Sequence, residues 1–128
     1  MTSATPPRTN KRILIADDQP VGRELLRTIL ESVGYEVSEA ADGVEALALA
    51  RSFEPDLILL DIHMPLRDGI SVVRELRADP RFASVPVIAV TATAMKGDRQ
   101  KGLEAGFSEY MTKPVPIATL RQMIERFL

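Results

Sequence analysis

One stretch of the sequence constrains the fold more than any other. Four apolar residues, 57–60, run directly into Asp61, and Pro65 breaks the chain four residues later. An unbroken apolar run of this kind is typical of a β-strand that is covered on both faces, as in a parallel sheet. Asp61 then lies where the strand leaves the core. A carboxylate at such a point can also do no more than open a turn, so its role depends on the rest of the chain.

Length and composition are those of a single domain. The chain has 128 residues, and its formal net charge of -2 provides no basic field for nucleic acid or an anionic membrane. No apolar run approaches the roughly 20 residues that span a bilayer. The absence of cysteine excludes disulfides and favours the reducing cytoplasm, and the single histidine excludes multi-histidine zinc sites. Residues 1–10, rich in Thr, Ser and Pro, are predicted to be a flexible tail before a domain at 11–128.

Short β-rich runs alternate with stretches of helical period along the whole chain. Strands are predicted at 12–16, 35–40, 57–60, 87–90 and 108–112, and helices at 21–33, 44–54, 69–78, 96–105 and 117–127. Five strand–helix repeats imply parallel pairing with right-handed crossovers. The first, third and fourth strands are the most apolar and belong in the centre. The sequence therefore predicts an α/β, doubly wound, flavodoxin-like sheet of five parallel strands in the order 2-1-3-4-5.

The predicted helices differ in their apolar faces, and that of helix 44–54 is expected to consist of Val44, Leu47 and Ala48. In helix 21–33 four residues recur every four positions and two leucines widen the stripe: Val21, Leu25, Ile29 and Val33, with Leu26 and Leu30. Helix 96–105 has little more than Leu103, and Gly97 and Gly102 each lower its propensity by about 1 kcal/mol relative to Ala. It is therefore expected to be the least secure and most mobile helix.

Polar side chains follow the predicted central strands and one edge strand. They are Asp17 and Asp18 after the first strand, Asp61 after the third, Thr91 after the fourth and Lys113 after the fifth. Each alone has a simpler explanation, as a turn, a β-branched strand residue or a surface charge. Because the carboxyl ends of parallel strands meet at one edge of the sheet, where doubly wound proteins bind ligands, we expect these groups to converge.

The expected cluster has the chemistry of a metal and phosphoryl site. Two carboxylates about 5 Å apart repel by roughly 3 kcal/mol at an effective dielectric constant near 20, so three need counter-charges. Lys113 supplies one positive charge and a divalent cation two more. Ligation by oxygen alone suits a hard ion such as Mg²⁺, which also recruits phosphate oxygens. A carboxylate in such a site can act as a nucleophile and form an acyl phosphate.

The motifs together resemble a known family. They are the acidic pair 17–18, the run 59–65, the pair 68–69, the segment 90–92 and the segment 110–114. In this order and spacing they resemble the receiver domain of two-component response regulators, including the chemotaxis regulators, over essentially residues 11–128.

The resemblance implies a role for each group at the sheet edge. Asp61 is expected to accept a phosphoryl group from the phosphohistidine of a histidine kinase or of a histidine phosphotransfer protein. Asp18 and Asp61 are expected to ligate Mg²⁺ directly, with Mn²⁺ as a possible substitute, and Asp17 through a water molecule. The backbone carbonyl of His63 is a further expected ligand, while its imidazole tunes dephosphorylation. Lys113 is expected to bind the phosphoryl group.

The resemblance also implies a switch and a partner surface. The hydroxyl of Thr91 is expected to turn towards the phosphoryl group, and the ring of Tyr110 to swing inwards. Thr93 is expected to be a tuning position, and the peptide before Pro114 to be cis. The fourth and last helices with the fifth strand then form the face that binds a downstream target, with no role for nucleic acid or membrane.

Four interpretations remain open at this stage. The leading one is a stand-alone receiver that catalyses only its own phosphorylation and dephosphorylation, so it is not an enzyme for external substrates. The second is a receiver from a hybrid histidine kinase. A flavodoxin-like cofactor binder is disfavoured because the acidic loop 17–20 would repel phosphate. A phosphatase with an Asp nucleophile usually has a second acid two residues on, where this chain has His63.

Overall fold

Five parallel strands form one sheet in the order β2-β1-β3-β4-β5. The computed structural model describes residues 11–92 and 98–128. The strands are β1 (Arg12–Ala16), β2 (Glu36–Ala40), β3 (Leu57–Asp61), β4 (Val87–Thr91) and β5 (Glu109–Thr112). The helices are α1 (Pro20–Ser32), α2 (Gly43–Phe53), α3 (Gly69–Ala78), α4 (Asp98–Ala105) and α5 (Ile117–Phe127). The predicted fold class and strand order are confirmed, whereas the predicted tail at 1–10 and Thr93 lie outside the described residues.

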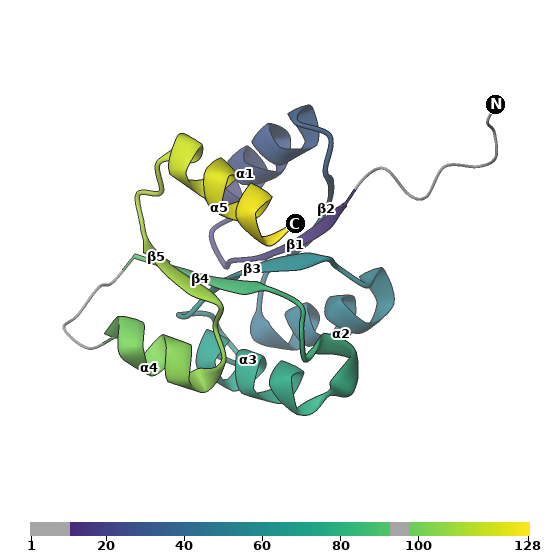
Figure 1. Cartoon of the computed structure of the whole chain (residues 1–128), viewed down its shortest axis with the longest axis vertical. Coiled ribbons are helices and arrows are strands. Elements are labelled where there is room, and N and C mark those ends of the chain that lie inside the picture. The colour runs from purple at the N-terminus through teal and green to yellow at the C-terminus, as the bar shows by residue number, and fades with distance from the viewer. Residues whose placement is uncertain (1–10, 93–97) are drawn as a thin grey trace.

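The central strands are covered on both faces because their side chains alternate between two helical layers. In β3, Ile58 and Leu60 join the core beneath α2, α3 and α4, while Leu57 and Leu59 join the core beneath α1 and α5. Figure 1 shows α1 and α5 on one face of the sheet and the other three helices on the opposite face. Every residue of β3 and β4 is buried, which explains their nearly continuous apolar sequences.

The register of the strands brings their carboxyl ends to one edge. Ala16 of β1 pairs with Leu60 of β3, so the residues that follow them, Asp17 and Asp61, leave the sheet side by side. Asp61 pairs in turn with Val90, the residue before Thr91. The chain reverses its direction across the sheet between β1 and β3, which is the switch point where ligands bind in this architecture.

The predicted core face of α1 is wrong for the residues spaced by four and correct for Leu26 and Leu30. Val21 is 80% exposed and Leu25 59% exposed, whereas Leu30 is fully buried and Leu26 packs against the core from a partly buried position. An α-helix has 3.6 residues per turn, so a row of residues spaced by four rotates about 40° at each step and cannot follow a straight sheet surface. The two leucines that seemed to widen the stripe are therefore the ones that anchor the helix.

Two further local predictions need correction. In α2 the buried residues are Gly43, Ala46, Leu47 and Ala50, while the expected core residue Val44 is 53% exposed. Residues 80–82, predicted as part of a loop, form a short 3-10 helix, Pro80–Phe82, whose Phe82 is buried. The structure describes α4 from Asp98, so the predicted start at residue 96 lies outside the described residues.

Gly102 of α4 has a packing role that its low helix propensity does not suggest. A Cβ atom at this position would lie 3.1 Å from Cδ2 of Tyr110 on β5, closer than ordinary van der Waals contact. The glycine therefore lets α4 approach the Tyr110 ring. Within the described ranges, none of the helices is long and apolar enough to span a bilayer.

Candidate functional site

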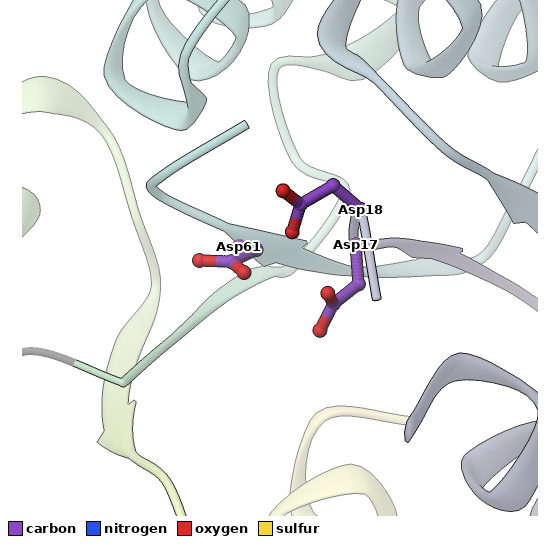
Figure 2. A group of neighbouring side chains, drawn as sticks. All are labelled: Asp17, Asp18 and Asp61. Carbon is purple, nitrogen blue, oxygen red and sulfur yellow. The ribbon is translucent and has the colours of Figure 1, made fainter. Parts of the chain in front are cut away.

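Two buried aspartates and one exposed aspartate form the centre of the site. Asp17 and Asp61, at the ends of β1 and β3, are 5% and 6% exposed, and Asp18 is exposed. One carboxylate oxygen from each residue lies within 4.8 Å of those from the other two. Figure 2 shows the three side chains projecting from the two neighbouring strand ends. The sheet topology thus joins residues that are 43 and 44 positions apart in the chain.

The backbone around Asp17 is fixed on three sides. Its N–H donates to the carbonyl of Ala40 at 3.0 Å, and its carboxylate Oδ1 accepts from the N–H of Gln19 at 2.9 Å. Its carbonyl accepts from Nη1 of Arg23 at 2.6 Å, while Nε of Arg23 pairs with Glu39 at 2.8 Å. Arg23 was missed by the sequence analysis, because its partners are a backbone carbonyl and a residue 16 positions away that only the fold brings near.

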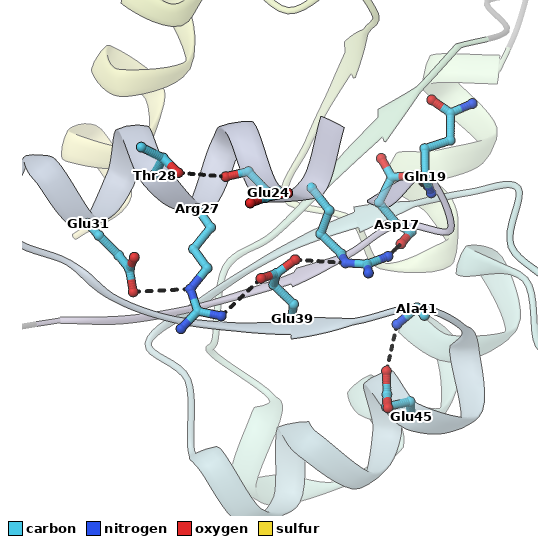
Figure 3. Close-up of polar contacts among 10 residues, drawn as sticks. Asp17, Gln19, Glu24, Arg27, Thr28, Glu31, Glu39, Ala41 and Glu45 are labelled. Atoms are coloured by element: carbon cyan, nitrogen blue, oxygen red, sulfur yellow. Dashed lines mark hydrogen bonds and ion pairs between the residues drawn. The ribbon is translucent and has the colours of Figure 1, made fainter. Parts of the chain in front are cut away.

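A second ion pair fastens the same helix to β2. Arg27 lies between Glu31 and Glu39, with nitrogen–oxygen distances of 3.2 Å and 3.0 Å (Figure 3). Burial raises the pKa of Glu39, but its hydrogen bonds to Arg27 and Arg23 and the charges of both arginines outweigh this, so its pKa lies below the usual value. Through Arg23 and Arg27 this network holds α1 against β2, next to the loop that carries Asp17 and Asp18.

The loop after Asp61 folds closely around it. The carboxylate Oδ1 accepts from the N–H of His63 at 3.0 Å, and the N–H of Gly69 donates to the carbonyl of Ile62 at 2.8 Å. A Cβ atom at residue 69 would lie 2.5 Å from the backbone oxygen of Asp61, so only glycine allows this approach. Asp68 then caps α3 by accepting from the N–H of Ser71 at 2.8 Å.

Lys113 links the two buried carboxylates. Its Nζ lies 2.7 Å from Oδ2 of Asp17 and 3.3 Å from Oδ2 of Asp61. The backbone N–H of Lys113 donates to the carbonyl of Thr91 at 2.7 Å, and Thr91 is completely buried at the end of β4. The peptide between Lys113 and Pro114 is cis, as the family resemblance predicted.

The charges of the site are unbalanced without a cation. Burial raises the pKa of Asp61 above its usual value, and the charge of Asp17 adds to this, against the opposing effects of the His63 N–H and of Lys113. Burial lowers the pKa of Lys113, but its contacts with Asp17 and Asp61 outweigh this, so its pKa is raised overall. Three carboxylates and one ammonium leave a formal charge of -2. A divalent ion that prefers oxygen ligands, such as Mg²⁺, fits this charge and this set of ligands.

Tyr110 and His63 are not part of the carboxylate cluster. Tyr110 pairs with Ala89 in the sheet and is partly buried, and both residues line a groove between α3 and α4. At the acidic edge the structure brings together five residues of the predicted site, namely Asp17, Asp18, Asp61, Thr91 and Lys113.

A doubly wound domain with buried aspartates and a lysine at this sheet edge is consistent with the class of phosphoryl-accepting signalling domains. The sequence model of the response regulator receiver domain matches residues 13–125. The chain belongs to this family. Receiver domains bind Mg²⁺ at their acidic site and interact with histidine kinases or phosphotransfer proteins and with downstream effectors.

Individual relatives support the same assignment. The polar-differentiation response regulator DivK of Brucella anthropi is 39% identical over 118 residues, which cover 92% of this chain and 96% of that protein. The receiver domain of a sensor histidine kinase from Pseudomonas aeruginosa, with a magnesium ion coordinated in its active-site cleft, is 39% identical. Its TM-score is 0.85, with 93% of this chain and 98% of that chain covered. The chemotaxis protein CheY4 of Vibrio cholerae is 31% identical with a TM-score of 0.87, over 94% of this chain and all of that one.

Proposed function

We propose that Asp61 is the phosphoacceptor of this receiver and that its donor is a phosphohistidine on a histidine kinase or phosphotransfer protein. The observation that carries the proposal is the position of Asp61: buried, contacted by Lys113 at 3.3 Å and grouped with two further carboxylates. A carboxylate oxygen of Asp61 attacks the phosphorus, an O–P bond forms, and the P–N bond breaks to leave the donor imidazole. The product is an acyl phosphate on Asp61.

The surrounding residues are proposed to prepare this transfer. When bound, Mg²⁺, or Mn²⁺ in its place, would supply positive charge that neutralises the carboxylates and the phosphoryl oxygens. Asp18, Asp61 and the backbone carbonyl of His63 would hold the metal directly, and Asp17 would hold it through a water molecule. Asp17 also keeps the ammonium of Lys113 within reach of a phosphoryl group on Asp61, which the 2.7 Å contact supports.

The response to phosphorylation is proposed to run through Thr91 and Tyr110. A phosphoryl group adds about one to two negative charges and new acceptor oxygens beside the buried end of β4. Thr91 turns towards them and Tyr110 moves inwards, which alters the face formed by α4, β5 and α5. Glu109 on this face joins all three elements, through Arg99 of α4 at 2.6 Å and Arg126 of α5 at 3.5 Å. A downstream target in the cytoplasm binds there.

The phosphodonor is proposed to dock on the apolar rim of the acidic site. We define this rim by five apolar side chains exposed near the carboxyl ends of the strands: Val21, Leu25, Val44, Leu66 and Ile117. Leu66 is 75% exposed in the loop that follows Asp61, and Leu25 and Ile117 line one shallow pocket that reaches Asp17 and Lys113. A partner that brings a phosphohistidine to Asp61 covers these residues.

We propose a single-domain regulator that acts on no substrate besides itself. Support comes from the DivK relative, which this chain matches over 96% of its length. The equally similar receiver of a sensor histidine kinase keeps the hybrid origin as the alternative. The complete reading frame distinguishes them, because a hybrid protein has a kinase region encoded in the same frame.

The test is Mg²⁺-dependent labelling by acetyl phosphate. Wild-type protein is expected to gain one base-labile acyl phosphate, and Asp61→Asn none. Asp56→Asn is the matched control, because Asp56 precedes the same strand at the opposite end from the site and accepts the N–H of Arg12 at 2.8 Å. Labelling of Asp61→Asn at the wild-type level would disprove the assignment. Multiple turnovers of an external phosphomonoester would instead identify a phosphatase.

A further inference from the structure

A groove between α3 and α4 opens beside the acidic site. Its volume is about 510 Å³, within the range of small-molecule sites. Ile62 and His63 line it from the loop after β3, Tyr110 from β5, Ile70 and Arg74 from α3, and Lys101 and Glu104 from α4. No role proposed above uses the space in this groove.

Two cations in the groove have no hydrogen-bond or ion-pair partner among the described residues. Of the described arginines, all except Arg74 and Arg121 hydrogen-bond to a polar group of the protein or form an ion pair with a carboxylate. The neighbouring acid Glu75 is already paired with Arg51 and Arg67. Within the described ranges Lys101 also has no ion pair, while Glu104 accepts a hydrogen bond from Gln100 at 3.1 Å. An anion between α3 and α4 would give both cations a charge-assisted partner.

The remaining lining is apolar and partly fixed. Ile62, Ile70 and Tyr110 are partly buried and pack against the core beneath α3 and α4. Gly102 lies against the Tyr110 ring and supports it from the α4 side. A planar ring system can pack on this surface, since aromatic and branched aliphatic groups form the walls of most small-molecule sites.

We propose that this groove binds a small amphiphilic anion, a planar apolar ring system that carries one phosphate, sulfonate or carboxylate group. The ring lies against Ile62, Ile70 and Tyr110, and the anionic group lies between Arg74 and Lys101. Among the lining residues that the structure describes, one negative charge matches the balance, because Glu104 offsets one of the two cations.

The test compares two probes that differ only in charge. 1-Anilinonaphthalene-8-sulfonate has two ring systems and one sulfonate, and N-phenyl-1-naphthylamine has the same rings without it. In fluorescence titrations the sulfonate probe is expected to bind at least about fivefold more tightly, the value of one exposed charge contact. Equal affinities would overturn the proposal.

Variants locate the binding site. Arg74→Ala and Lys101→Ala are each expected to weaken the sulfonate probe about fivefold and to leave the neutral probe unchanged. Arg121→Ala is the matched control, because Arg121 is likewise exposed and has no hydrogen-bonding partner among the described residues, but it lies on α5. Amide chemical-shift changes are expected at Ile62 and Ile70. Unchanged affinity in both groove variants, or shifts confined to the apolar rim on α1, would disprove the site.

Occupancy of the groove is linked to Asp61, because Ile62 follows it directly and Tyr110 belongs to the proposed switch. This link rests on the proposed function. Acetyl phosphate with Mg²⁺ is expected to change the affinity for the sulfonate probe. An unchanged affinity in labelled protein overturns the link alone. A protein that takes up no label contradicts the proposed function, while the titrations with groove variants still decide the site.

Discussion

At the scale of single residues, Asp61 is held in a position that favours its protonated form. Burial raises its pKa above the usual 3.8, so the folded protein binds this proton more tightly than the unfolded chain does. This contribution to stability is fully present below the usual pKa and is lost as the pH rises through the raised one. At neutral pH the ionised carboxylate therefore lowers the stability of the metal-free fold.

Replacing Asp61 by Asn tests this directly. In metal-free buffer at pH 7, Asp61→Asn is expected to raise the free energy of unfolding by about 1 kcal/mol, because it removes one of three clustered negative charges. The gain should shrink as the pH falls through the raised pKa of Asp61, where the wild-type carboxyl becomes neutral. Urea unfolding across this pH range measures it, and a variant less stable than wild type at pH 7 contradicts the argument.

At the scale of elements, Arg77 of α3 connects segments that no strand pairing holds. Its Nε donates to the carbonyl of Gly106 at 2.8 Å, and its Nη1 donates to those of Phe82 and Val85, each at 2.7 Å. Its Nη2 lies 3.3 Å from the hydroxyl of Ser108. Burial lowers its pKa, and in the described structure it pairs with no carboxylate. The end of α3 is thereby tied to the connections before β4 and after α4.

Arg77→Lys is expected to lower the free energy of unfolding by about 2 kcal/mol, because an ammonium cannot reach all these acceptors and leaves buried carbonyls unsatisfied. Chemical unfolding provides the measurement. Arg74→Lys serves as the control, because Arg74 lies on the same helix and pairs with no residue in the described part of the chain. Its free energy of unfolding should stay within about 0.5 kcal/mol of wild type. Equal losses in the two variants would show that the contacts of Arg77 do not stabilise the fold.

The buried and exposed faces of α1 are expected to contribute differently to the free energy of unfolding. Leu30→Ala is expected to lower the free energy of unfolding by about 3 kcal/mol, since Leu30 is fully buried. Leu25→Ala removes a side chain that is 59% exposed and should lower it by less than about 1 kcal/mol.

Phosphotransfer from a protein donor should slow in Leu25→Ala, with labelling by acetyl phosphate unchanged. Equal slowing with both donors would contradict docking on the apolar rim.

At the scale of the whole molecule, metal binding and folding stability are coupled, because the three carboxylates come together only when the ends of β1 and β3 meet. Mg²⁺ at 100 times its Kd is expected to raise the free energy of unfolding by about 2.7 kcal/mol. Asp18→Asn should lose most of this gain, and Asp56→Asn should retain it. Unfolding with and without Mg²⁺ measures the effect, and equal stabilisation of both variants would place the metal elsewhere.

Strand order and the acidic site could be predicted because each depends on a pattern that is visible in the amino-acid sequence. Continuous apolar runs such as 57–60 mark strands covered on both faces, and the residue after each run lies at the carboxyl edge of the sheet. The core face of α1 could not be predicted in this way. Its sequence offers apolar residues over a wide arc, and only the position of the sheet decides that Leu30 is buried and Val21 is exposed.

The sequence by itself determined which chemical groups reach the sheet edge: Asp17, Asp18 and Asp61 with Thr91 and Lys113. Because the strands are parallel, the residue that follows each strand lies at the carboxyl edge of the sheet, whatever the details of packing. Only the tertiary structure decided how these groups are held. The contact of Lys113 with both buried carboxylates, the support of Asp17 by Arg23 and the close approach of Gly69 to Asp61 depend on distances between segments far apart in the chain. Those distances follow from packing, which no local pattern encodes.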